Sequence, residues 1–93
     1  MSALEIETFR LRGEVSDESF LALDEELLAW RYLHRTGLQR RTTARASDGE
    51  WLIDTWWDSA ARADDPESSE LTSQWTAVID PASYQRRIYR SLD

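Results

Sequence analysis

The sequence predicts an α+β fold in which two helices pack on one four-stranded antiparallel sheet. Three observations predict it: a hairpin whose second arm is rich in aromatic residues, two stretches with helical periodicity, and an alternating segment near each end of the chain. A chain of 93 residues is too short to give each of two halves its own core, so we expect one domain spanning 1–93.

The hairpin is the centre of the predicted fold. Residues 51–57 contain three of the five tryptophans, with Ile53 and Thr55 between them. Bulky aromatic and β-branched side chains favour a pleated, buried surface, so this segment is the predicted central strand. The turn signal Ser-Asp-Gly-Glu at 47–50 separates it from residues 38–46, which alternate as a second strand.

The first predicted strand is residues 4–12, where apolar and polar side chains alternate. Its apolar residues change face midway, from Leu4 and Ile6 to Phe9. This change predicts a strand that is covered on both sides, or a bulge near Thr8.

A helix is predicted after this strand, capped by Ser16 and ending at residues 35–37, where glycine follows the last turn. Its apolar residues recur every three or four positions. They form one stripe, which contains Phe20, Leu23, Leu27, Trp30 and His34.

The second helix is predicted to begin at Asp58, to break near 64–66 and to run to Ile79. Asp65 and Pro66 provide a cap and a first-turn proline where the helix resumes. Residues 84–92 then alternate well enough to form the last strand.

The predicted order is strand, helix, strand, strand, helix, strand, which is the ferredoxin-like β-α-β-β-α-β arrangement with both helices on one face of the sheet. The strand 51–57 carries tryptophan on both of its faces, and the helices can cover only one of them. A second subunit packing sheet to sheet would cover the other, so we expect a homodimer formed through the sheet face.

Composition excludes several classes of protein. The net charge of −7 argues against a nucleic-acid binder, because neutralising phosphates requires a basic surface. The absence of cysteine excludes disulfides and thiolate metal sites, and no spacing of carboxylates or histidines predicts a metal site. No segment has the length and apolarity of a signal peptide or a membrane span, so we expect a cytoplasmic protein without membrane contact.

The charged residues of the strands require partners. The arginines of residues 38–46 are expected to meet water or the carboxylates of Glu5, Glu7 and Asp54. Asp54 lies among apolar residues and could act as a base of raised pKa. We favour an ion pair across the dimer, with Arg40, Arg41, Arg45, Arg86 or Arg87.

Several short segments resemble the dimeric α+β barrel superfamily, in particular the small relatives of the antibiotic biosynthesis monooxygenases. The segments are Gly-Leu-Gln-Arg-Arg at 37–41, Asp-Gly-Glu-Trp at 48–51, Thr-Trp-Trp-Asp-Ser at 55–59 and Asp-Pro-Ala-Ser at 80–83. The resemblance implies a dimer and a pocket between helices and sheet. The asparagine that haem-degrading and cofactor-free members of the superfamily use is absent from this chain, and we expect no cofactor.

His34, the single histidine, is also a catalytic candidate, as a general base or ligand contact facing the helix–sheet cavity. We favour the simpler interpretation, in which a histidine in a last helical turn contacts free carbonyls. Trp30 and Trp75 are expected to line a pocket for an aromatic ligand, although filling the core would also explain them.

Three functional hypotheses follow. The first is an α+β barrel dimer that binds a small hydrophobic or aromatic ligand, and the second is a cofactor-independent monooxygenase acting on a phenolic or polycyclic substrate. The third is a dimerisation module with a filled core.

Overall fold

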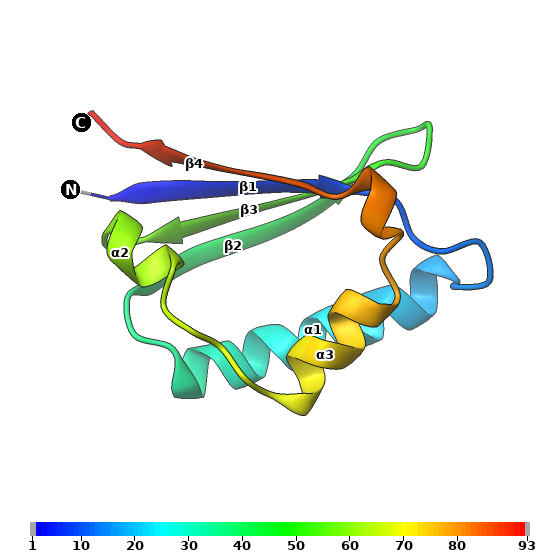
Figure 1. The fold of residues 1–93 in the computed structure, drawn as a ribbon, viewed down its shortest axis with the longest axis horizontal. Helices are drawn as coiled ribbons and strands as arrows, with labels where there is room; N and C mark the ends of the chain where they lie inside the picture. The colour runs from blue at the N-terminus through cyan, green and yellow to red at the C-terminus, as the bar shows by residue number, and fades with distance from the viewer. Residues whose placement is uncertain (1, 93) are drawn as a thin grey trace.

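The computed structural model describes residues 2–92 and contains a four-stranded antiparallel sheet with the order β2-β3-β1-β4 (Figure 1). The predicted β-α-β-β-α-β order is confirmed, with the second helix divided in two. The elements are β1 (Ala3–Phe9), α1 (Asp17–His34), β2 (Leu38–Arg45), β3 (Trp51–Trp57), α2 (Ala60–Ala63), α3 (Glu70–Ala77), a 3₁₀ turn (Pro81–Ser83) and β4 (Gln85–Arg90).

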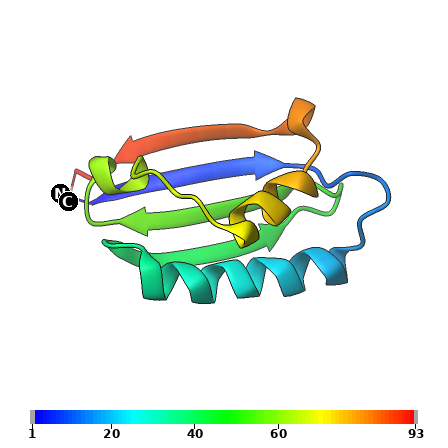
Figure 2. The ribbon, with the colours of Figure 1, turned by 60° about the horizontal axis from the view of Figure 1, so that its bottom comes forward.

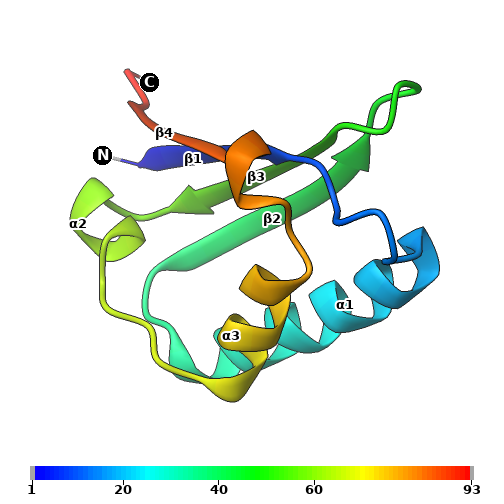
Figure 3. The same cartoon turned by 45° about the vertical axis from the view of Figure 1, so that its right-hand side comes forward.

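All the helices of the described residues lie on one face of the sheet, and none of these residues forms an element on the opposite face (Figures 1 and 3). Strict alternation along β3 assigns its residues to these two faces, as the sequence predicts. The helix-side residues Trp51, Ile53, Thr55 and Trp57 are at most 4% exposed, whereas Leu52, on the open face, is 37% exposed.

Strand β1 shows the same alternation, and its register with β3 runs without interruption past Thr8, so the predicted alternative of a bulge is wrong. Leu4 and Ile6 lie on the open face, as expected. The helix-side face carries Phe9 together with Glu5 and Glu7, which are 7% and 5% exposed. Two carboxyl groups are therefore buried beneath the helices.

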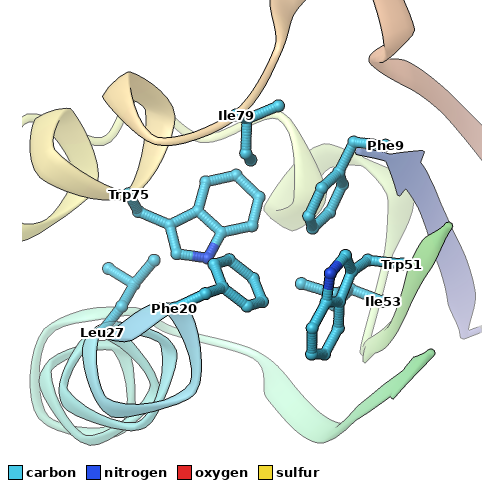
Figure 4. Packing of buried hydrophobic residues seen from close by; sticks show 7 residues of the cluster. All are labelled: Phe9, Phe20, Leu27, Trp51, Ile53, Trp75 and Ile79. Carbon is cyan, nitrogen blue, oxygen red and sulfur yellow. The ribbon is translucent and has the colours of Figure 1, made fainter. Parts of the chain in front are cut away.

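The apolar core lies between α1, α3 and the end of the sheet where β1 finishes and β3 begins (Figure 4). The ring of Trp75 from α3 lies edge-on to Phe9, with centroids 5.3 Å apart, and Phe20 from α1 contacts Trp51 at 4.8 Å. The cluster consists of Phe9, Phe20, Leu27, Trp51, Ile53, Trp75 and Ile79.

Helix α1 begins as predicted, with the Ser16 hydroxyl accepting a hydrogen bond from the Ser19 amide. Its stripe is buried at Phe20 and Leu27 and partly buried at Trp30, but His34 is exposed. Asp24, which the apolar pattern leaves beside the stripe, is only 5% exposed.

The second predicted helix differs most from expectation. Helix α2 ends at Ala63, residues 64–69 form a linker that opens with a turn at Asp64, and α3 begins only at Glu70 with Ser69 as its cap. The predicted restart at Asp65 and Pro66 is wrong, because the linker side chain Glu67 reaches α1 instead of joining a helical turn. Figure 2 shows this linker crossing the sheet between α2 and α3.

The predicted partners of the β2 arginines are also corrected. Arg41 binds Asp24 on α1 and Arg45 binds Asp17 at the start of the same helix. Glu5 instead binds Arg86 on β4. Asp54 accepts a hydrogen bond from the Thr42 amide, and its ion pair across the dimer stays a prediction.

Replacing Asp24 with alanine is expected to destabilise the fold by about 3 kcal/mol or more, because the Arg41 charge, with its side chain 1% exposed, would lose its counter-ion. Urea unfolding followed by circular dichroism measures this. Glu25→Ala, at an exposed position of the same helix, is the control and should change stability by less than about 0.5 kcal/mol. Equal effects of the two variants would contradict the role of Asp24.

Candidate functional site

Two adjoining hollows lie beside α3. The apolar cleft, of about 270 Å³, is lined by Trp75, Thr76, Ile79, Pro81 and Tyr84. The polar cavity, of about 210 Å³, lies beneath the linker and reaches the β1 carboxyl groups. Both hollows share Trp75, Thr76 and Tyr84, so one molecule could occupy the cleft and extend a polar end into the cavity.

The walls of the apolar cleft are held by specific contacts. The indole Nε1 of Trp75 donates a hydrogen bond to Asp24 Oδ1 at 2.9 Å, which fixes the orientation of the ring. On the opposite side the Tyr84 ring is stacked on Phe9, with centroids 6.4 Å apart. An aromatic ligand would meet surfaces that are already ordered, which lowers the entropic cost of binding.

The roof of the polar cavity is fastened by Glu67. Arg31 donates two hydrogen bonds to its carboxylate, each 2.9 Å long, and Arg35 donates a third at 2.7 Å. The hydroxyl of Thr72 adds a fourth at 2.6 Å. Burial alone would raise the pKa of Glu67, but the hydrogen bonds from Arg31 and Thr72 outweigh it and lower that pKa to about 2.

Arg35 forms a second part of this roof. Its guanidinium lies 4.4 Å from the Trp57 ring centroid, in cation–π contact, and donates to the Arg62 carbonyl. Its Nε is buried and, among residues 2–92, has no hydrogen-bond partner. An unpaired donor therefore remains beside the cavity.

The floor of the polar cavity carries the two β1 carboxyl groups, which have different partners. Glu5 accepts hydrogen bonds from Trp57 Nε1 at 3.0 Å and from Arg86 Nε. Glu7 accepts one from the Tyr84 hydroxyl at 2.6 Å and has no ion-pair partner among the described residues. Burial and the nearby Glu5 raise the pKa of Glu7, and burial and Glu7 in turn raise that of Tyr84.

The three residues that the sequence suggests as ligand contacts lie in different places in the structure. Trp75 lines both hollows. Trp30 packs against the core, outside the residues that line either hollow, and the His34 ring stacks on it at 4.6 Å. His34 is exposed, and its Nδ1 donates to the Trp30 carbonyl at 2.9 Å, which is the helix-end contact favoured from the sequence. A ligand role for Trp30 and His34 stays a prediction.

Sequence reasoning missed Glu7, Tyr84, Glu67 and the two arginines of the roof. One available signal was the alternation of β1, because Glu5 and Glu7 share the parity of Phe9, a residue assigned to a buried face. No local pattern marks the ion pairs of Glu67, since its arginine partners are 36 and 32 residues away in the chain.

The four-stranded antiparallel sheet with its helices on one face is the ferredoxin-like α+β fold, and comparison with solved structures agrees. Rv0793 from Mycobacterium tuberculosis is 16% identical, covering 100% of this chain and 97% of its own, with a TM-score of 0.75. SnoaB, a cofactor-independent oxygenase from Streptomyces nogalater, is 12% identical over 99% and 94%, with a TM-score of 0.76.

A protein from Caulobacter crescentus with the provisional description antibiotic biosynthesis monooxygenase is 8% identical over 99% and 91%, with a TM-score of 0.78. No family model and no curated protein matches this chain. The chain thus has the fold of the antibiotic biosynthesis monooxygenase-like proteins, as the sequence resemblance implies, and identities this low establish the fold alone.

No helix within residues 2–92 has the length and apolarity needed to span a bilayer. Over the same residues, no three histidine, aspartate or glutamate side chains are grouped so that they could hold a metal ion.

Changing Glu67 to glutamine is expected to lower the free energy of unfolding at neutral pH by about 2 to 3 kcal/mol. The folded pKa of about 2 lies below the ordinary 4.5, so this stabilisation is present above the unfolded value and is lost as pH falls towards about 2. Urea unfolding at several pH values measures it. Glu70→Gln, at an exposed position, is the control, and a pH-independent cost in Glu67→Gln would contradict the ionic origin.

Proposed function

We propose that this protein is a homodimeric α+β barrel that binds a small aromatic molecule between α3 and the sheet. The observation that carries the proposal is the apolar cleft, which adjoins a polar cavity and shares Trp75 and Tyr84 with it. Its volume of about 270 Å³ suits one or two fused rings. A cytoplasmic location stays part of the proposal and is tested by fractionation of the host cells.

Filling the cleft is expected to abolish ligand binding. Thr76→Trp places an indole at a lining position, so the affinity for naphthalene, measured by tryptophan fluorescence and calorimetry, should fall at least about tenfold. Ser73→Trp adds the same side chain at an exposed position of α3 outside the cleft and should bind as the wild type does. No binding by the wild type would favour the dimerisation module with a filled core.

The open face of the sheet supports the homodimer. Leu52 and Tyr89, 37% and 44% exposed, stand on this face with Leu4, Ile6 and Trp56, and no element within residues 2–92 covers them. Contiguous apolar surface of this kind marks an interaction site. A second copy of the chain is the fitting partner, because Asp54 and the arginines of the same face, Arg40 and Arg87, supply opposite charges for a self-complementary contact.

Placing a charge in the middle of this face is expected to produce monomers. Trp56→Lys would bury an unpaired ammonium in the proposed interface, so native mass spectrometry should show a dimer for the wild type and a monomer for the variant. Leu33→Lys, at a position on α1 that is 82% exposed, is the control and should remain dimeric. A monomeric wild type would refute the proposed assembly.

A second candidate function is cofactor-independent oxygenation of a phenolic or polycyclic substrate. It is supported by the structural likeness to SnoaB, whose description is a cofactor-independent oxygenase. Consumption of oxygen by the purified protein with an electron-rich phenol, absent in the Thr76→Trp variant, would favour this function over binding alone.

A further inference from the structure

Glu7 lies where the apolar cleft meets the polar cavity. It projects from the helix-side face of β1, is 5% exposed and lines the cavity. Its Oε2 accepts the hydrogen bond from Tyr84, and the Tyr84 side chain is a wall of both hollows. A molecule lying along Tyr84 in the cleft would therefore reach this carboxyl group with its end.

The charged groups that face Glu7 leave it without a counter-ion. Arg31 of α1 and Arg41 of β2 lie near enough to act on it electrostatically, but Arg31 binds Glu67 and Arg41 binds Asp24. Arg86 of β4 lies opposite Glu7 in the sheet register, but its guanidinium binds Glu5 and Asp64. Glu5, two residues along the same face, adds a like charge. Burial and Glu5 raise the pKa of Glu7 despite these arginines and Tyr84, which favours the neutral acid.

A neutral carboxyl group at this position would be a hydrogen-bond donor. Because Oε2 accepts from Tyr84, the proton is best placed on Oε1. Within residues 2–92 no hydrogen bond reaches Oε1, and the side chain borders the cavity. A buried acid that donates in this way can stabilise an oxygen atom carrying partial or full negative charge.

We propose that Glu7, held by the Tyr84 hydroxyl, donates a hydrogen bond to the carbonyl oxygen of an aryl ketone or related aryl carbonyl compound whose rings occupy the apolar cleft. The inference rests on the proposed binding function and specifies its ligand class. Tyr84 is the positioning residue, since its hydroxyl occupies the accepting oxygen of the carboxyl group.

The test compares two probes of the same shape: 2-acetylnaphthalene, and 2-isopropenylnaphthalene, in which a methylene group replaces the carbonyl oxygen. Affinities are measured by calorimetry from about pH 5 to about pH 9. The ketone is expected to bind about tenfold more tightly than the hydrocarbon at the acidic end. This preference should disappear as pH rises, because ionised Glu7 loses the donated proton and repels the carbonyl oxygen.

Two variants separate the donor from a merely structural role. Glu7→Gln keeps a neutral donor of the same shape, so its preference for the ketone should persist across the whole pH range. Glu7→Leu removes the donor, so the preference should be absent at every pH while the hydrocarbon still binds. Circular dichroism verifies folding, and the glutamine variant alone decides the question if the leucine variant does not fold.

The outcomes distinguish the two proposals. If the wild type binds ketone and hydrocarbon equally, or prefers the ketone independently of pH, the role of Glu7 is refuted and the binding cleft stands. The same holds if Glu7→Gln retains the wild-type pH dependence. If neither probe binds, the proposed binding function fails and the Glu7 inference fails with it.

Discussion

The carboxylate of Asp24 is the interaction on which the arrangement of this structure depends. It accepts two hydrogen bonds from Arg41, at 2.6 and 3.0 Å, one from Thr43 at 2.7 Å and one from Trp75 at 2.9 Å. These bonds join α1 to β2 and to α3. Although burial opposes ionisation, they lower the pKa of Asp24, so the charged form is the one they hold. Because Trp75 walls both hollows, the same carboxylate also determines the shape of the site.

The polar cavity exists because the second helix is interrupted. Helix α3 has eight residues and covers only part of the sheet, and over Glu5 and Glu7 the linker replaces it (Figure 2). A linker has few apolar side chains to bury, so it is held by charge instead, through Glu67 and its arginine partners. The result is a space with a polar roof and a polar floor beside an apolar core.

Some carboxyl groups near this cavity have an arginine partner and one does not, and this difference is the distinctive chemical property of the cavity. Three carboxylates, those of Asp24, Glu67 and Glu5, each bind arginine, whereas Glu7 has, among residues 2–92, only the tyrosine hydroxyl as its partner. A buried carboxyl group without a counter-ion does not improve packing, which makes it a candidate for function. The cleft that adjoins this cavity is apolar, so a ligand that fills both would have to combine a hydrophobic body with a polar end.

Local patterns in the sequence determined the elements of the fold. The alternation of residues 51–57, the turn at Gly49 and the Ser16 cap depend on neighbouring residues, and each agrees with the structure. The faces of β1 were also readable, because a period of two holds along any strand. The resemblance to the antibiotic biosynthesis monooxygenase-like proteins added the expectation of a hollow between helices and sheet.

Only the tertiary structure decided which side chains surround that hollow. The linker at 64–69 departs from the predicted helix because Glu67 gains Arg31 and Arg35, which are distant in sequence. Likewise, the exposure of His34 and the burial of Asp24 depend on how helices rest on the sheet. Ion pairs and burial between remote segments leave no periodic trace, so the sequence by itself determined the elements, and packing decided which side chains form the site.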